Sequence, residues 1–184
     1  MIKATDLCSP PQSAEKATLD HPLEHLVACH RRIEDRLDTL ERVIPHLAGR
    51  REESLTAIQN SLRFFDTNGT WHTADEEESL FPRLAPFLNA EEKAFVQNLE
   101  RQHQEAESIF DALKKAALVL SAESPCSVDA IEEYERLCRR LCEIYRAHIA
   151  AEDSRLPELG RRLLPEIAMK ELSREMKLRR GLEA

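Results

Sequence analysis

The chain has 184 residues, a formal net charge of -8 and 33% charged residues, but only 4 glycines. This length and composition are typical of a soluble globular protein with one core, and the scarcity of glycine favours long helices. The negative charge argues against nucleic acid as a partner, since binding to phosphate backbones requires a basic surface.

No apolar run in the sequence is long enough to span a bilayer, and the N-terminus is too polar for a signal peptide. We therefore expect a cytoplasmic protein that does not bind membranes. An odd number of cysteines, 5, fits reduced thiols in that compartment. Cys138 and Cys142 are predicted to be small buried hydrophobes on one helix face, and the roles of these two and of Cys29 stay open.

Hydrophobic periodicity predicts four long helices, and residues 1–19, which have none, are interpreted as a flexible N-terminal arm. The first helix is expected to begin near Asp20, with Pro22 in its first turn. The second is expected to run from about Arg51 into the 80s, with Gly69 as its weakest point. Residues 20–160 are thus predicted to form an up-down-up-down four-helix bundle.

The later helices have clear start signals. Asn89 and Glu92 form a capping-box pattern for the third helix, and a turn ending at Ser127 precedes the fourth. Pro165 is expected to open a shorter fifth helix that ends near Gly181. Residues 161–184 are therefore assigned to a C-terminal helix and tail.

Each of the four long helices carries an apolar stripe that polar side chains interrupt. Three of the helices repeat the spacing H-x-x-x-E, and the first contributes a single histidine. The interrupting residues are His30, His72, Glu76, His103, Glu107, His148 and Glu152.

These seven side chains are predicted to share one layer of the bundle, because a helix rises about 1.5 Å per residue and neighbouring helices run antiparallel. Burying unpaired charges there would cost several kcal/mol, so something must compensate them. One buried His–Glu pair can satisfy itself, but three aligned pairs and a fourth histidine favour a metal site. Seven ligands exceed the needs of one ion and fit two ions bridged by carboxylates.

Nitrogen and oxygen donors without thiolates favour iron or manganese over a structural zinc site, although zinc is also possible. The motifs ACHRRIE, WHTADEE, RQHQEAE and YRAHIAAED carry a resemblance to hemerythrin-like (HHE cation-binding) domain proteins over about residues 20–160. The resemblance implies a non-haem di-iron centre with an oxo or hydroxo bridge inside a four-helix bundle. It also implies that Glu76 bridges the ions and that the nitrogen ligands are His30, His72, His103 and His148.

The sequence departs from the oxygen-carrying hemerythrins on the third helix, where those proteins have a second histidine and this chain has Glu107. An additional carboxylate favours the ferric state, so we expect no reversible oxygen carriage. Whether Glu107 is monodentate or bridging stays open. On the fourth helix Glu152 is favoured over Asp153 because it stays on the face of His148, and Asp75 is an alternative to Glu76.

The resemblance implies a protein that binds or processes a small diatomic ligand or peroxide, in oxidative or nitrosative stress or in iron handling. An electron-transfer or regulatory protein partner is left open. Two alternatives are a ferritin-like di-iron oxidase and a metal-free interaction module whose polar layer sets the helix register. The first alternative is disfavoured because ferritin-like helices carry E-x-x-H instead of H-x-x-x-E.

Overall fold

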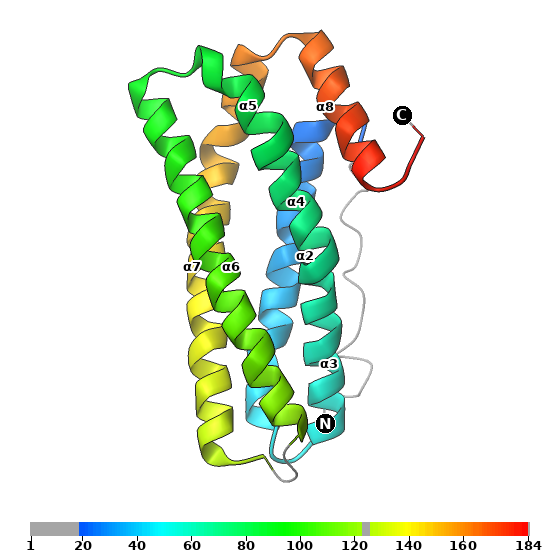
Figure 1. The fold of residues 1–184 in the computed structure, drawn as a ribbon, viewed down its shortest axis with the longest axis vertical. Helices are drawn as coiled ribbons and strands as arrows, with labels where there is room; N and C mark the ends of the chain where they lie inside the picture. Colours follow the sequence, from blue (N-terminus) through cyan, green and yellow to red (C-terminus); the bar gives the residue numbers. More distant parts are fainter. Residues whose placement is uncertain (1–18, 123–125, 184) are drawn as a thin grey trace.

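The computed structural model describes residues 19–122 and 126–183, and these form an all-α protein, as predicted. The predicted flexible arm, residues 1–19, lies outside the described residues except for Leu19. The described residues form four long helical segments and a shorter C-terminal helix, which Figure 1 shows packed beside them. The long segments are α2 (Pro22–Arg42), α3 to α5 (Arg51–Leu84), α6 (Ala90–Ala122) and α7 (Val128–Leu163), and the last helix is α8 (Glu166–Arg179).

The second long segment is a composite helix. It contains α3 (Arg51–Phe64), the π-helical turn η2 (Phe65–Gly69), α4 (Thr70–Ala74), the π-helical turn η3 (Asp75–Leu80) and α5 (Phe81–Leu84). Gly69 does not end the helix. It is buried, and a Cβ atom at this position would lie 3.4 Å from Cδ1 of Phe65. Because π-helical turns are rare and widen the helix locally, they change which side chains face the core.

Local capping chemistry sets the helix starts. The capping box of α6 is confirmed, because the backbone N–H of Glu92 donates to Asn89 Oδ1 (3.0 Å) and that of Asn89 donates to Glu92 Oε2 (2.9 Å). The Ser127 hydroxyl accepts the N–H of Ala130 at the start of α7. The N-cap of α2 is His21, one residue later than expected, with Pro22 in the first helical position. The 3-10 turns η1 (Ile44–His46) and η4 (Ala85–Phe87) follow α2 and α5.

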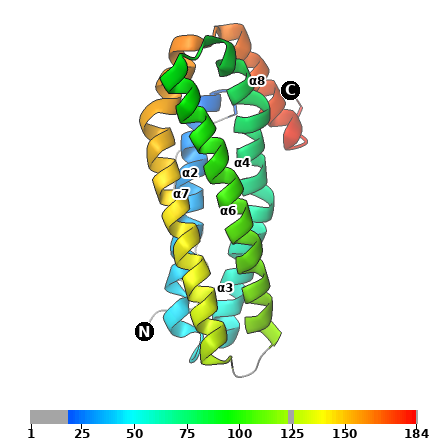
Figure 2. The ribbon, with the colours of Figure 1, turned by 60° about the vertical axis from the view of Figure 1, so that its left-hand side comes forward.

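The four long segments close into an antiparallel bundle. Helix α6 packs against α7 and α3, and α2 packs against α7 and α3, which Figures 1 and 2 show from two sides. Two apolar clusters fill the interior at different heights. One contains Ile33 and Phe65, and the other contains Leu26 and Leu80. Among the described residues, none of the helices combines the length and the apolar character needed to cross a bilayer.

Candidate metal centre

A layer of buried polar side chains separates the two apolar clusters. On α2, His30 follows Leu26 of one cluster and precedes Ile33 of the other. On α6, His103 follows Leu99 and precedes Ala106 in the same way. The histidines His30, His72, His103 and His148 are all buried, as are Glu76 and Glu152. The spacing along the four helices therefore places these six predicted side chains at one level of the bundle.

The six side chains form two groups of four candidate ligands that share two members. The first group is His30, His72, Glu76 and Glu152, and the second is Glu76, His103, His148 and Glu152. Within each group, one ligand atom from every residue lies within 4.8 Å of the others. Two histidines per group and two shared carboxylates are the arrangement expected for a pair of bridged cations.

The histidine spacing fits cation binding. Nε2 of His30 lies 3.1 Å from Nε2 of His72, and Nε2 of His103 lies 2.9 Å from Nε2 of His148. Two nitrogens bound at about 2.1 Å and at a right angle on one metal ion are about 3.0 Å apart. Each histidine pair therefore already has the separation of adjacent ligands on one ion.

Both shared carboxylates reach both groups. Oε1 of Glu76 lies 3.5 Å from Nε2 of His72, and Oε2 lies 3.5 Å from Nε2 of His103. Oε2 of Glu152 lies 3.0 Å from Nε2 of His30 and 3.1 Å from Nε2 of His148. Glu76 thus presents one oxygen to each histidine pair, which is the geometry of a bridging carboxylate.

The carboxylate oxygens also show that the layer is incomplete without a cation. Glu76 and Glu152 are 0% exposed. Within residues 19–122 and 126–183, neither oxygen of Glu76 nor Oε1 of Glu152 has a hydrogen-bond partner, whereas Oε2 of Glu152 contacts the imidazoles of His30 and His148. Leaving a buried polar group unsatisfied costs about 1 to 3 kcal/mol, and more when the group is charged. Cations bound by the two carboxylates would compensate these buried oxygens, so the residues present fit a metal pair.

Burial and close approach strongly shift the pKa values of these groups. Burial, followed by the charges of Glu152 and Asp75, raises the pKa of Glu76 well above its usual range. Burial and the adjacent His30 hold the pKa of His72 well below its usual range. Burial opposes charge on Glu152 as well, but the imidazoles of His148 and His30 outweigh it and lower its pKa. A bound cation favours ionised carboxylates and neutral imidazoles, which is the form that ligands require.

Polar side chains orient the rings of three histidines from behind. Nδ1 of His30 lies 2.6 Å from Asp153 Oδ1, Nδ1 of His103 lies 2.8 Å from Glu77 Oε1, and Nδ1 of His148 lies 3.0 Å from Gln102 Oε1. Such contacts fix the tautomer and direct Nε2 toward a metal. For His30, burial lowers the pKa, but its contacts with Asp153 and Glu152 raise it to about 9.

Sequence reasoning missed these supporting partners, although the chain carries a signal for them. Asp153 directly follows Glu152, Glu77 directly follows Glu76, and Gln102 directly precedes His103. Each partner is therefore the neighbour of a candidate ligand on its own helix but contacts the histidine of another helix. A polar residue next to each ligand is the pattern that could have identified them.

The structure does not bring Glu107 into either group. Position 106, three residues after His103, takes the buried place on α6 and is filled by Ala106, whereas Glu107 is exposed. Asp75, the alternative to Glu76, is buried but faces α8, where Arg179 and Arg180 pair with it. Asp153 lies outside both groups as well, behind His30.

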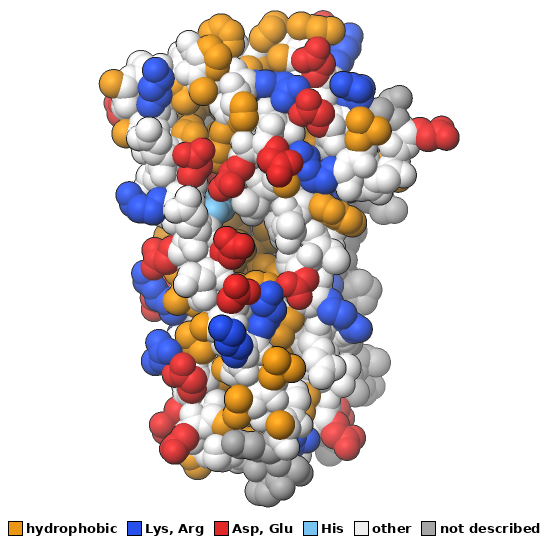
Figure 3. Space-filling view, in the orientation of Figure 1, with side chains coloured by type: hydrophobic (Ala, Val, Ile, Leu, Met, Phe, Trp, Pro, Cys, Tyr) orange, Lys and Arg blue, Asp and Glu red, His pale blue; other side chains and the backbone are white. Residues whose placement is uncertain are grey.

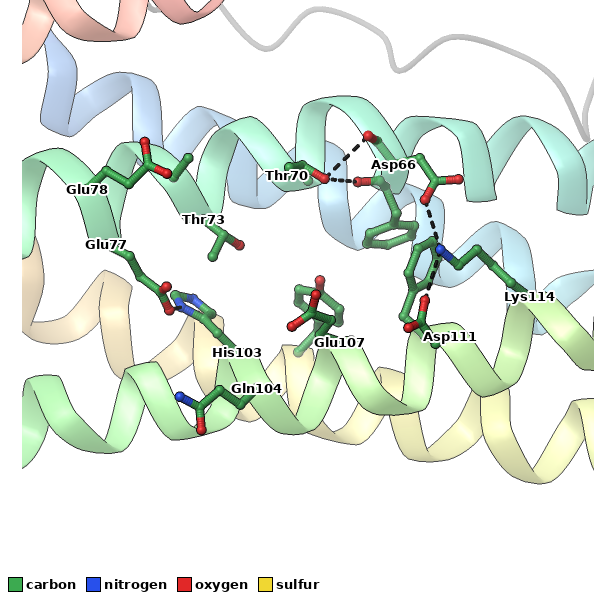
Figure 4. Close-up of a pocket in the computed structure, with 15 residues that line it drawn as sticks. Asp66, Thr70, Thr73, Glu77, Glu78, His103, Gln104, Glu107, Asp111 and Lys114 are labelled. Atoms are coloured by element: carbon green, nitrogen blue, oxygen red, sulfur yellow. Dashed lines mark hydrogen bonds and ion pairs between the residues drawn. The ribbon is translucent and has the colours of Figure 1, made fainter.

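Glu107 instead lines a cavity of about 340 Å³ that reaches the centre at His103. Figure 4 shows His103, Glu77, Thr73 and Glu107 around the space between the η2–η3 segment and α6. In Figure 3 the same face is hollowed, with acidic side chains around the opening. The acidic lining residues are Asp66, Glu77, Glu78, Glu107 and Asp111, against one lysine, Lys114. A small molecule can therefore approach His103 from solvent along an acidic path.

The comparison with protein families agrees with this geometry. Residues 21–159 match the family model described as the hemerythrin HHE cation binding domain. No curated protein matches the chain. The matched region contains all six clustered side chains.

Proposed function

Because this chain belongs to the hemerythrin HHE cation-binding domain family, we propose that its buried centre holds two iron ions and binds or processes a small oxidant. The small oxidant is oxygen, peroxide or nitric oxide, and the physiological role is in oxidative or nitrosative stress or in iron handling. The single observation that carries the proposal is the sharing of Glu76 and Glu152 by two histidine pairs.

The donor set supports iron. Four imidazoles and two carboxylates, without thiolates, suit iron or manganese better than the tetrahedral, cysteine-rich sites of structural zinc. When bound, an iron pair supplies the one- and two-electron chemistry that small oxidants require. The chain itself limits the access of water to the centre, because the six clustered side chains are buried between two apolar clusters and the cavity reaches them at His103.

The cavity beside α6 supports a small ligand. It reaches His103 but has only about 340 Å³, and Phe65, Phe110 and Tyr145 close part of its wall. Glu77 lines the same cavity and holds Nδ1 of His103. The side of the centre that contains His103 and His148 is therefore the side that an incoming ligand meets first.

The alternative of a metal-free interaction module fits the geometry less well. It would leave both oxygens of Glu76 and Oε1 of Glu152 buried without hydrogen bonds in the described structure. Native proteins bury few such groups, because each one destabilises the fold.

Metal analysis and spectroscopy test the proposal. The protein is purified without added metal, its iron, manganese and zinc contents are measured, and its near-ultraviolet absorption is recorded before and after reduction. We expect about two irons per chain and an absorption band of the diferric pair that disappears on reduction. The spectrum of the reduced protein should then change when oxygen, peroxide or nitric oxide is added. A protein that retains no metal, or only zinc without any spectral response, contradicts the proposal. The double variant Glu76→Gln and Glu152→Gln is the metal-free control.

A further inference from the structure

Helix α8 lies outside the part of the chain that matches the family. The match ends at residue 159, whereas α8 spans Glu166–Arg179 and packs against η3 and α2. Figure 1 shows α8 beside the upper part of the second long segment. The turn η3 begins with Asp75 and contains Glu76, so α8 contacts the segment that supplies a shared carboxylate of the centre.

The contact is centred on Asp75, whose side chain is 0% exposed. Nη2 of Arg180 donates to Oδ2 of Asp75 (2.6 Å) and Nη1 donates to Oδ1 (3.2 Å), while Arg179 donates to the same Oδ1. The guanidinium of Arg180 is fixed further by Met176 O, at 2.8 Å, and by the ring of Trp71, whose centroid is 5.6 Å away. A carboxylate buried this deeply requires such partners, since an unpaired charge there would cost several kcal/mol.

Further contacts attach the rest of η3 to α8. Arg179 also donates to Glu78 Oε2 (3.1 Å) and to the hydroxyl of Ser79 (3.2 Å). In α5, three residues past the end of η3, Arg83 forms two hydrogen bonds with the carboxylate of Glu175, at 2.7 and 2.9 Å. Two fully buried α8 side chains join the apolar cluster that includes the end of η3. These side chains are Leu172 and Met176.

Asp75 and Glu76 are adjacent in a π-helical turn, but their side chains contact different parts of the molecule. The Asp75 carboxylate is fixed by α8, whereas both Glu76 oxygens reach the histidine pairs. Because the two residues share one peptide unit, a shift of Asp75 displaces Glu76. Glu76 has no hydrogen bond of its own to the described residues, so its position depends on this backbone.

We propose that α8 positions Glu76 through the pairing of Asp75 with Arg179 and Arg180, so that docking of α8 and metal binding strengthen each other. The coupling is reciprocal by thermodynamic necessity: if docked α8 raises the metal affinity by some factor, bound metal stabilises docked α8 by the same factor. Asp75 and the two arginines are positioning residues, because none of them belongs to either ligand group. The stability of the docked surface helix α8 thereby depends on whether the buried centre holds metal.

The first test compares two double variants that remove the same charge from α8. Arg179→Gln with Arg180→Gln breaks the pairing, whereas Lys170→Gln with Arg174→Gln removes two exposed cations of the same helix. Each protein is loaded anaerobically with Fe(II), and the release of iron to a chromogenic chelator is timed. We expect the first variant to release iron about tenfold faster than wild type, which is the lower end of the effect of a ligand-supporting residue. The control variant should release iron at the wild-type rate.

Two outcomes of this test overturn the proposal. One is an equal release rate in both double variants and wild type. The other is an unchanged release rate in Arg179→Gln/Arg180→Gln although its α8 amides have lost protection against hydrogen exchange. The conservative variant Arg179→Lys with Arg180→Lys keeps the charge but not the bidentate hydrogen bonds. Its rate of iron release should lie between those of wild type and the glutamine variant.

A second measurement uses only the wild-type protein, so it tests the proposal even if a variant fails to fold. Hydrogen exchange of α8 amides is compared in metal-free and Fe(II)-loaded wild type. We expect slower exchange in the loaded protein, by up to about the factor by which docked α8 raises the equilibrium affinity for iron. Equal exchange in both states overturns the coupling.

The inference rests on metal binding at the proposed centre, and the two proposals can fail separately. A chain that binds no metal refutes the proposed function, whereas a chain that binds two ions without affecting α8 refutes only the coupling.

Discussion

Glu76 and Glu152 are the two side chains common to both groups of candidate ligands, and each approaches a histidine of either pair. Under the proposal that each group holds a cation, the two positions depend on each other. Loss of a shared carboxylate would then remove a ligand from both positions, while loss of one histidine would remove a ligand from one.

We expect Glu76→Gln and Glu152→Gln each to lower the metal content from about two ions per chain to nearly none. An amide is a poor bridge, because it lacks the charge that offsets two cations. By contrast, His30→Ala should leave substantial metal on the His103 and His148 side. Metal content by elemental analysis, with helicity by circular dichroism, checks this. Loss of the same single ion in all three variants would contradict a shared bridge.

Glu107→Gln distinguishes the sequence-based expectation from the geometry. A ligand role predicts loss of metal, whereas the exposed position of Glu107 outside both groups predicts about two ions per chain, as in wild type. We expect the second result. The measurement is metal content after dialysis against a chelator. The matched control is Glu105→Gln, at an exposed position on the same helix.

The sequence predicts the features that local periodicity determines. The capping box of Asn89 and Glu92 and the alignment of four histidines follow from spacing along single helices. Periodicity favours Glu107 as the polar residue of the third helix, but Ala106 also follows His103 by about one turn, and only the packing of α6 against its neighbours selects between them. The direction of Asp75 depends on the π-helical turn in which it lies, and its partners come from α8, more than 100 residues away. Contacts between helices of this kind are not encoded in a local pattern.

His103→Leu should lose metal and keep the fold. His103 is 9% exposed and its ring stacks beside that of Phe81, so an apolar side chain fits the site. Replacing buried polar groups with hydrophobic residues is often neutral or stabilising, so the free energy of unfolding of the metal-free variant should equal or exceed that of metal-free wild type by up to about 2 kcal/mol. Chemical denaturation of both metal-free proteins measures this. An unfolded variant would show that His103 is needed for packing.

Cys138 and Cys142 are expected to resist alkylation in the folded protein. Both are buried, Cys142 donates to Leu37 O over 3.9 Å, and the hydrogen bond with Cys138 together with burial raises the pKa of Cys142. Only the thiolate reacts, and a raised pKa keeps the thiol protonated through pH 9, where an ordinary cysteine is largely ionised. Peptide mapping after iodoacetamide treatment between pH 7 and 9 should show little label at Cys142 until guanidinium unfolds the chain. Rapid native labelling that increases with pH would contradict this reasoning.

The acidic cavity should favour uncharged ligands over anions. Five carboxylates and one lysine line it, and Figure 4 places Thr73 and Glu107 in its wall. We expect Thr73→Phe to slow the binding of both nitric oxide and azide, because the added ring narrows the path to His103. The variant Thr56→Phe, at an exposed position on α3, is the size-matched control. Glu107→Gln with Asp111→Asn should instead speed azide binding by about tenfold at low ionic strength and leave nitric oxide binding unchanged, since charge in a cleft acts on charged ligands and is screened by salt. Stopped-flow absorbance of the iron-loaded protein measures both rates, and equal effects on the two ligands would show that the carboxylates do not act through their charge.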